Sequence, residues 1–156
     1  MSASLTLDTN DLLAVLRGHG MAARAAKVFG GVHTVFDLLD VVAKGLPKES
    51  LTAVVDAATR NATEAVSARR RVIPDATWKR RTVRLSPDES DRTLRLARLV
   101  TLTRLVWHGN AEDVSEFLST PHPLLHGRTP LENSATDLGT ELVEGILLRL
   151  MYGVAG

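Results

Sequence analysis

The sequence predicts an all-α protein, and three observations support this fold class. The 156 residues are 44% hydrophobic and only 4% aromatic, and the apolar share is mostly Leu, Val and Ala, as is typical of packed helices. Apolar residues recur three and four positions apart along most of the chain, which indicates helices with one buried face. No segment alternates apolar and polar residues convincingly, so we expect no β-strand.

The first half of the chain predicts four helices that are separated by glycines and a proline. Three end at glycines, which accept the backbone conformation that terminates a helix, and should cover about 10–17, 21–29 and 32–44. The fourth begins near Pro47, a residue suited to a first helical turn. The last two carry stripes that we expect to be buried, namely Val32, Val35, Phe36, Leu39, Val42 and Ala43, and then Leu51, Val54, Val55 and Ala58.

Two short helices, over about 64–71 and 74–82, and one long helix come next. Thr63 is expected to cap the first of them. The sequence Ser86-Pro87-Asp88-Glu89 has the pattern of a capping box with proline at the first helical position. The long helix that it opens should run to about His108. Apolar residues cover most of its circumference, so we expect it to be central and mostly buried.

The C-terminal third predicts a defined loop between a first helix and two that follow it. A helix over about 111–118 precedes a stretch, Thr120–Thr129, that is too rich in Pro and Gly to be regular. A one-turn helix should begin with the capping-box pattern Thr129-Pro130-Leu131-Glu132. The last helix, over about 137–152, carries one apolar face that we expect to be buried: Leu138, Leu142, Val143, Ile146, Leu147 and Leu150.

Charge is distributed unevenly along the chain, although the formal net charge is only +1. Residues 60–84 hold eight basic and two acidic side chains, whereas residues 105–156 hold two basic and seven acidic ones. A basic middle and an acidic C-terminal third suggest two surfaces with two different partners.

The basic stretch has the pattern of a helix-turn-helix. Its two short helices are joined by a tight turn at Val72-Ile73, flanked by longer helices and rich in arginine. In that geometry the second helix enters the major groove, where basic side chains contact phosphates and guanine edges. The alternative is a solvated charged face on a helical protein. We interpret Trp78 as a core residue, because one isolated tryptophan makes no stacking platform for bases.

Other classes of function find little support in the sequence. The absence of cysteine excludes a disulfide framework, a thiolate zinc site and a cysteine nucleophile. His122 and His126 lie four residues apart, but nearby prolines prevent the helix that would bring them together on a metal ion. We find no catalytic constellation and no segment able to span a membrane. We therefore expect a non-enzymatic, cytoplasmic protein without a metal, cofactor or membrane partner.

Three stretches, taken together, make the sequence recognisable. They are IPDATWKRR (73–81), LSPDESDRTLRLAR (85–98) and PHPLLHGRTPL (121–131), followed by the ending YGVA. In this order and spacing, over about residues 30–156, the chain resembles the Xre/MbcA/ParS-like antitoxins, which are encoded beside toxins that carry a RES domain. The resemblance implies an N-terminal helical extension (1–29), an Xre-like helix-turn-helix DNA-binding region (30–92) and a small helical toxin-binding domain (93–156).

In this family the first region binds operator DNA of its own gene pair, and the second covers the active site of the toxin. RES toxins resemble ADP-ribosyltransferases and consume NAD, so the cofactor chemistry belongs to the partner. The resemblance implies DNA contacts at Thr77, Lys79, Arg80 and Arg81, to which the basic run adds Arg69, Arg70 and Arg71. It implies toxin contacts at Pro121, Leu124, Gly127, Arg128, Pro130, Arg149, Tyr152, Gly153 and Val154.

We therefore predict an antitoxin that blocks the active site of a RES-type toxin and represses its own operon. The alternative is a stand-alone helix-turn-helix transcriptional regulator whose C-terminal domain only dimerises. Because operators of this kind are usually palindromic, we expect a homodimer, although the sequence does not indicate which helix supplies the interface. The small, apolar end of the chain from Tyr152 is expected to enter a pocket of the toxin.

Overall fold

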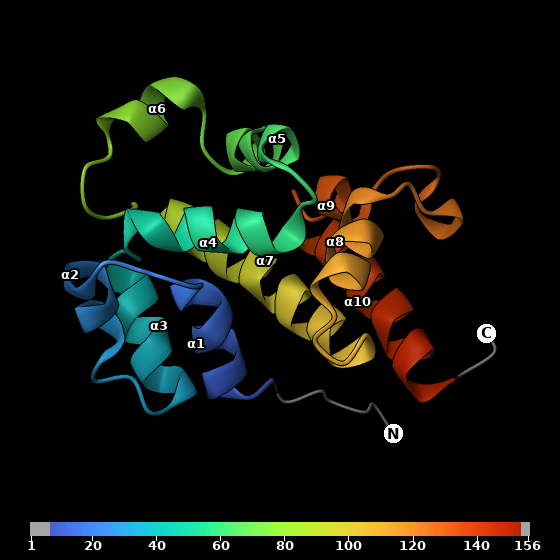
Figure 1. The fold of residues 1–156 in the computed structure, drawn as a ribbon, viewed down its shortest axis with the longest axis horizontal. Coiled ribbons are helices and arrows are strands. Elements are labelled where there is room, and N and C mark those ends of the chain that lie inside the picture. The colour runs from blue at the N-terminus through green and yellow to red at the C-terminus, as the bar shows by residue number, and fades with distance from the viewer. Residues whose placement is uncertain (1–6, 154–156) are drawn as a thin grey trace.

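A computed structural model, which describes residues 7–153, confirms the all-α fold (Figure 1). Within that range the chain forms α-helices and short 3-10 helices, and its one β-type pairing is an isolated bridge between Pro47 and Arg84. The elements in chain order are α1 (Thr9–Arg17), α2 (Ala23–Ala26), η1 (Lys27–Phe29), α3 (Val35–Lys44), α4 (Lys48–Ala58), α5 (Ala62–Val72), α6 (Asp75–Arg80), α7 (Pro87–Val106), α8 (Ala111–Ser119), η2 (Pro123–Leu125), α9 (Pro130–Asn133) and α10 (Asp137–Tyr152).

The long helix α7 is the central element, as its apolar circumference predicted (Figure 1). It packs against α1, α3, α4, α5, α8 and α10. The predicted capping box at its start is confirmed: the Glu89 N–H donates to the Ser86 hydroxyl at 3.2 Å, and the Ser86 N–H donates to the Glu89 carboxylate at 2.7 Å. Because α7 contacts six other helices, it sets the positions of both the basic and the acidic parts of the chain.

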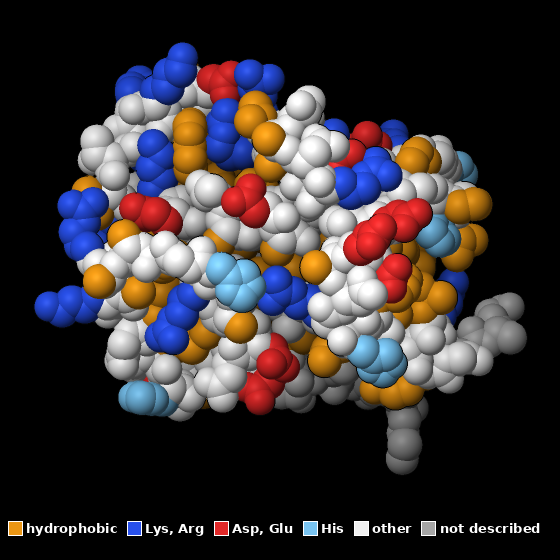
Figure 2. All heavy atoms as spheres, viewed as in Figure 1, with side chains coloured by type: hydrophobic (Ala, Val, Ile, Leu, Met, Phe, Trp, Pro, Cys, Tyr) orange, Lys and Arg blue, Asp and Glu red, His pale blue; other side chains and the backbone are white. Residues whose placement is uncertain are grey.

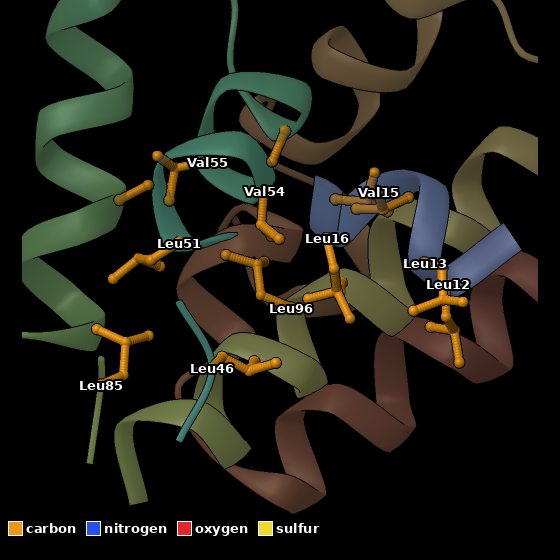
Figure 3. Packing of buried hydrophobic residues seen from close by; sticks show 14 of the residues in the cluster. Leu12, Leu13, Val15, Leu16, Leu46, Leu51, Val54, Val55, Leu85 and Leu96 are labelled. Atoms are coloured by element: carbon orange, nitrogen blue, oxygen red, sulfur yellow. The ribbon is translucent and has the colours of Figure 1, made fainter. Parts of the chain in front are cut away.

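The main core lies among α1, α4 and α7 (Figure 3). Leu16 of α1 and Leu51 of α4 are fully buried there, and Leu96 of α7 packs into the same cluster. The predicted burial of the α4 stripe is confirmed for Leu51, Val54, Val55 and Ala58. The N-terminal helix, which lies outside the recognisable part of the sequence, is therefore part of the core.

A second, smaller core cluster joins the end of α7 to α10 and to the loop before α9. Its buried members are Leu99, Leu102, Leu125, Val143, Ile146 and Leu147. Since α7 contributes to both clusters, it connects the two halves of the molecule as one continuous helix.

Helix α3 buries a different face from the one that its apolar spacing predicted. Val35, Phe36 and Leu39 are 47%, 73% and 50% exposed. Leu38, which was not in the predicted stripe, faces the core beside Val42. The predicted burial is confirmed for Val32 and Val42. It is wrong for Val35, Phe36 and Leu39, and also for Ala43, which is exposed. The physical reason is that α3 is apolar around much of its circumference, so its packing against α7 decides which side is covered.

Helix α10 departs from its predicted face in the same way. Leu138, Leu142 and Leu150 are exposed, although the four-residue spacing predicted their burial. The side of α10 that faces the core carries Val143, Ile146 and Leu147. Two of the exposed leucines, Leu138 and Leu142, lie one turn apart on the same side of the helix.

Candidate functional site

The predicted helix-turn-helix corresponds to α5 and α6, which lie over α4 (Figure 1). The cap of α5 is Asn61 and not the predicted Thr63, because the Asn61 side chain accepts a hydrogen bond from the Glu64 N–H at 2.9 Å. Ile73, in the turn between the two helices, is fully buried and anchors the turn to the core.

Helix α6 is shorter than predicted, since it spans Asp75–Arg80 where we expected a helix over 74–82. The chain that follows it is extended along the start of α4. The Leu85 N–H donates to the Leu46 carbonyl at 2.8 Å, and the Lys48 N–H donates to the Val83 carbonyl at 3.0 Å. Because these bonds hold the backbone in an extended conformation, helix α6 ends after fewer than two turns.

Trp78 holds α6 against the body of the protein, as its interpretation as a core residue predicted. It packs against the main core, with the Lys48 Nζ 4.3 Å from the centre of its ring and the Arg69 guanidinium carbon 5.1 Å from it. Cations are attracted to the face of an indole ring. Lys48 also donates to the Arg81 carbonyl at 2.8 Å. Tertiary contacts therefore fix the orientation of this short helix.

Three of the arginines predicted to bind DNA are engaged within the protein. Arg69 forms an ion pair with Asp75, and the Arg70 Nε lies 2.9 Å from the other oxygen of the same carboxylate. The Arg69 guanidinium holds the pKa of Asp75 below its ordinary value against a smaller effect of desolvation, and Arg70 adds to the lowering. Arg71 pairs with Glu132 of α9 at 3.7 Å.

A fourth predicted contact, Arg81, is bound to Glu89 in the first turn of α7. The Arg81 Nε lies 2.8 Å from one carboxylate oxygen, and its Nη2 lies 3.4 Å from the other. The Glu89 side chain is only 7% exposed. Burial raises the pKa of this carboxyl, but the Ser86 N–H and the Arg81 guanidinium outweigh it, so the pKa lies below its ordinary value.

Lys79 and Arg80 remain exposed at the end of α6 and have no carboxylate partner among residues 7–153. Arg84, which the sequence prediction did not include, shares this property. Thr77 is half-buried, and its hydroxyl lies 3.5 Å from the Arg80 Nη2. Figure 2 shows Lys and Arg side chains gathered over α5 and α6. The cationic groups free to meet a phosphate therefore centre on the C-terminal end of α6.

The loop predicted to bind the toxin is ordered by its own hydrogen bonds. The His122 N–H donates to the Arg128 carbonyl at 3.0 Å, and the Gly127 N–H donates to the His122 carbonyl at 3.2 Å. Leu125 packs beneath the loop into the smaller core cluster. Pro130 is buried at the first position of α9. The exposed residues of the predicted set in this loop are Pro121, Leu124, Gly127 and Arg128.

Helix α10 presents a largely exposed face, which we call the α10 face, with the half-buried Gly145 at its middle. Its members lie three or four residues apart: Leu138, Leu142, Gly145, Arg149 and Tyr152. Leu138 is 68% exposed, and Leu142 and Tyr152 are each 55% exposed. A Cβ added at Gly145 would meet no atom within 4 Å. Gly153 ends the helix in the left-handed conformation, with a φ of 61°, and Val154 lies outside the described residues.

Sequence reasoning missed Leu138 and Leu142 as surface residues and did not single out Gly145 between them and Arg149. The two leucines were assigned to the core because they are spaced four residues apart, as are many buried leucines. Arg149 and Tyr152, which were predicted to be contacts, continue the same spacing. That shared helical face was the signal that could have identified the leucines.

Two family comparisons cover most of this architecture. Residues 37–98, from α3 into α7, match the antitoxin Xre-like helix-turn-helix domain. Residues 101–153, from α7 to the end of α10, match the antitoxin Xre/MbcA/ParS C-terminal toxin-binding domain. The chain is therefore similar to both domains of the Xre/MbcA/ParS antitoxins.

Among curated proteins, the chain is similar to an antitoxin Xre from Pseudomonas putida, with 36% identity over 88 residues. The aligned region covers 54% of this chain and 55% of the relative. The chain thus spans about half the length of the curated relative that it matches.

The two matched regions meet inside α7, because one match ends at residue 98 and the other begins at residue 101. Three ion pairs add to this connection: Arg71–Glu132 at 3.7 Å, Arg95–Asp137 at 2.8 Å and Arg98–Glu144 at 2.9 Å. Over residues 7–153, none of the helices is long and apolar enough to cross a membrane, and no three potential metal ligands lie together.

Proposed function

We propose that this Xre-family protein is an antitoxin that blocks the active site of a RES-type, NAD-consuming toxin and represses its own operon. The toxin binds the α10 face together with the loop over 121–128, and operator DNA binds the end of α6. The protein acts in the cytoplasm, as a homodimer on a palindromic operator.

The observation that carries the proposal is the α10 face. Leu138 and Leu142 are large apolar side chains that remain open to solvent in the domain that matches the toxin-binding family. Exposed apolar stripes of this kind mark interaction surfaces. Gly145 adds a second argument, because glycine inside a helix costs about 0.5–1 kcal/mol relative to alanine. No neighbour among residues 7–153 requires a glycine there, whereas a closely approaching partner would require one.

Support for DNA binding comes from the surface over α5 and α6. Lys79, Arg80 and Arg84 are free to contact phosphates, which supply the sequence-independent part of DNA affinity. The ion pairs of Asp75 with Arg69 and Arg70 bridge α5 and α6. We therefore assign a positioning role to Arg69 and leave direct contact to the end of α6.

The two proposed surfaces can be occupied together. In Figure 1, α6 and α10 lie at different sides of the molecule, and α7 runs between them. A protein with this arrangement can hold a toxin and an operator at the same time.

The test uses a RES-domain toxin encoded beside the gene and measures NAD consumption as the antitoxin is titrated in. We expect the double variant Leu138→Asp/Leu142→Asp to inhibit the toxin about 100-fold less well, because two apolar contacts are replaced by charges that must be desolvated. Val66→Asp is the matched control: Val66 is 41% exposed on α5, far from α10 in sequence, and its change should leave inhibition intact.

Operator binding and helical content of the double variant should equal those of the parent. Full inhibition by the double variant would overturn the assignment of the α10 face. If the double variant instead lost self-association, with no neighbouring RES reading frame, the stand-alone regulator with a C-terminal dimerisation domain would be the better explanation.

A further inference from the structure

A small pocket with aromatic walls lies between the end of α7 and α8, and we call it the aromatic pocket. Its volume is about 230 Å³, and its walls include Trp107 at the end of α7, Phe117 of α8 and His122 in the loop after α8. The centres of the Trp107 and Phe117 rings are 4.9 Å apart, and the His122 ring stands edge-on to Phe117 at 6.1 Å. All three side chains are half-buried, so the pocket presents aromatic surface that is partly open to solvent.

Local structure holds these three rings in place. Trp107 and Phe117 both pack against the two core clusters. The Asn110 N–H donates to the Trp107 carbonyl at 3.0 Å, and the Asn110 side chain caps α8. The Leu124 N–H donates to the His122 Nδ1 at 3.2 Å, which fixes the orientation of that ring. The aromatic pocket is therefore formed before any partner binds, and a preformed site loses less conformational freedom on binding.

Two carboxylates of α8 line the same pocket. Asp113 lies one helical turn before Phe117, and Glu116 directly precedes it. Neither acid forms an ion pair with a base among residues 7–153. Arg60 lines a neighbouring hollow beside α8 and is paired with Glu64 at 2.7 Å. Figure 2 shows acidic side chains over α8 with apolar ones beside them, so negative charge and aromatic surface lie together here.

The other tryptophan of the chain shows the contact that this pocket lacks. The ring of Trp78 has the Lys48 Nζ at 4.3 Å from its centre and the Arg69 guanidinium carbon at 5.1 Å. Among residues 7–153, no Lys or Arg lies over the ring of Trp107 or Phe117 in this way. Aromatic faces attract cations, and carboxylates form strong hydrogen bonds with them. The aromatic pocket therefore has the side chains of a cation site, and the described part of the chain supplies no cation.

We propose that the aromatic pocket binds the guanidinium group of an arginine side chain from a protein partner. A planar guanidinium stacks on the Trp107 ring while its N–H groups donate to Asp113 and Glu116. Pockets for whole small molecules usually hold about 300–1,000 Å³, so a volume of about 230 Å³ suits the end of one side chain.

The identity of the partner rests on the proposed function. The aromatic pocket lies within residues 101–153, the region that matches the toxin-binding family, and Pro121 belongs both to its walls and to the loop proposed to contact the toxin. Residues 105–156 hold seven acidic and two basic side chains, which favours a basic surface on the partner. The arginine is therefore assigned to the toxin, next to the contacts of the 121–128 loop.

The first experiment needs no toxin and uses the full chain with N-acetyl-arginine amide as the probe. In proton–nitrogen correlation spectra, the indole N–H signal of Trp107 should shift saturably, with a dissociation constant in the millimolar range, because single exposed contacts of this kind are weak. N-acetyl-citrulline amide has nearly the same shape without the charge and should bind at least about tenfold more weakly. The Trp78 signal is an internal control that should not move, because Lys48 and Arg69 already contact its ring.

A double variant tests the two carboxylates. Asp113→Asn/Glu116→Gln removes both charges and keeps the shape of the side chains, so it should bind the arginine probe at least about tenfold more weakly. Glu112→Gln is the matched control, because Glu112 also lies in the first turn of α8 but lines the neighbouring hollow. It should bind the probe as the parent does. Circular dichroism and thermal unfolding check that both variants are folded.

Calorimetry with the toxin tests the source of the arginine. The double variant should bind the toxin at least about tenfold less tightly than the parent, whereas Glu112→Gln should bind it equally well. If the double variant bound the arginine probe poorly but bound the toxin as the parent does, the assignment of the arginine to the toxin would be wrong.

The probe experiment and the proposed function fail in different ways. A saturable shift at Trp107 that needs the charge of the probe and the two carboxylates supports the guanidinium site. No saturable shift at tens of millimolar arginine probe, or an equal shift with the citrulline probe, would overturn the site and leave toxin binding by the α10 face intact. A parent that binds the arginine probe but inhibits no RES-domain toxin would overturn the proposed function and the toxin as partner, while the guanidinium site itself would be supported.

Discussion

The carboxylate of Glu89 lies 2.8 Å from the Arg81 Nε and, at the same time, accepts the N–H of Ser86 that opens α7. One buried acid thus joins the segment after the proposed recognition helix to the central helix of the protein. Arg81 is therefore expected to stabilise the fold, and its removal cannot be interpreted as the loss of a DNA contact alone.

The first prediction concerns the pH dependence of stability. The pKa of Glu89 in the folded protein lies below its ordinary value of 4.5, so its ionised form stabilises the fold at neutral pH. This stabilisation is complete above about pH 4.5 and is lost as the pH falls through the folded pKa. Glu89→Gln keeps the cap but removes the charge, and should cost about 1–3 kcal/mol at pH 7.

Urea unfolding at pH 7 and pH 3 measures this effect. The difference in unfolding free energy between the parent and Glu89→Gln should shrink at the lower pH, because the parent carboxyl is then being protonated. An equal difference at both pH values would show that the charge of Glu89 contributes nothing.

The second prediction separates free from engaged cations on the DNA-binding side. Lys79→Ala and Arg80→Ala should each weaken operator binding and reduce the slope of log affinity against log salt by about one. Arg71→Ala is the control, because Arg71 pairs with Glu132 on α9, and it should leave the slope unchanged. Fluorescence anisotropy across a salt series measures these slopes. If Arg71→Ala reduced the slope and Lys79→Ala and Arg80→Ala left it unchanged, our assignment of α6 would be wrong.

The third prediction concerns the N-terminal helix. Leu16 is fully buried between α1 and the main core, so Leu16→Ala should lower the free energy of unfolding by about 2–5 kcal/mol. Ala14→Ser, on the exposed side of the same helix, should change it by less than about 0.5 kcal/mol. Chemical denaturation compares the two. A Leu16→Ala protein as stable as the parent would mean that α1 is dispensable.

The fourth prediction contrasts two glycines of α10. A Cβ at Gly139 would collide with the Asn133 carbonyl oxygen and lie 2.9 Å from the Thr136 Oγ1, so Gly139→Ala should destabilise the protein by about 1–3 kcal/mol. Gly145→Ala has open space and should stabilise it by about 0.5–1 kcal/mol. Under the proposed function, Gly145→Ala nevertheless weakens toxin binding. If Gly145→Ala were more stable and still inhibited the toxin fully, Gly145 would no longer support a toxin contact on α10.

The fifth prediction concerns the end of α10. Tyr152 is 55% exposed, so Tyr152→Ala should change the free energy of unfolding by less than about 0.5 kcal/mol. If its ring is buried against the toxin, the same change should weaken inhibition by about 10–100-fold, the equivalent of losing one large apolar contact. Calorimetry of toxin binding measures this loss directly, with operator affinity as the property that should not change.

The sequence by itself determined where most helices lie. Ser86 and Glu89 cap α7 as their spacing predicted, because a capping box is a local interaction that depends on neighbours in the chain. The order of three motifs likewise indicated the family, which the two domain matches support. Local chemistry also predicted that Trp78 would belong to the core.

Only the tertiary structure decided which faces of α3 and α10 are covered. Both helices are apolar on more than one side, so their periodicity predicts a helix without selecting its buried face. Packing against α7 buries Leu38 and Val143 and leaves Phe36 and Leu138 in solvent. The same holds for the arginines: charge counting placed Arg70 on a basic surface, but the fold brings Asp75 within 2.9 Å of it. A contact between residues on different helices depends on their positions in space, which composition and spacing do not contain.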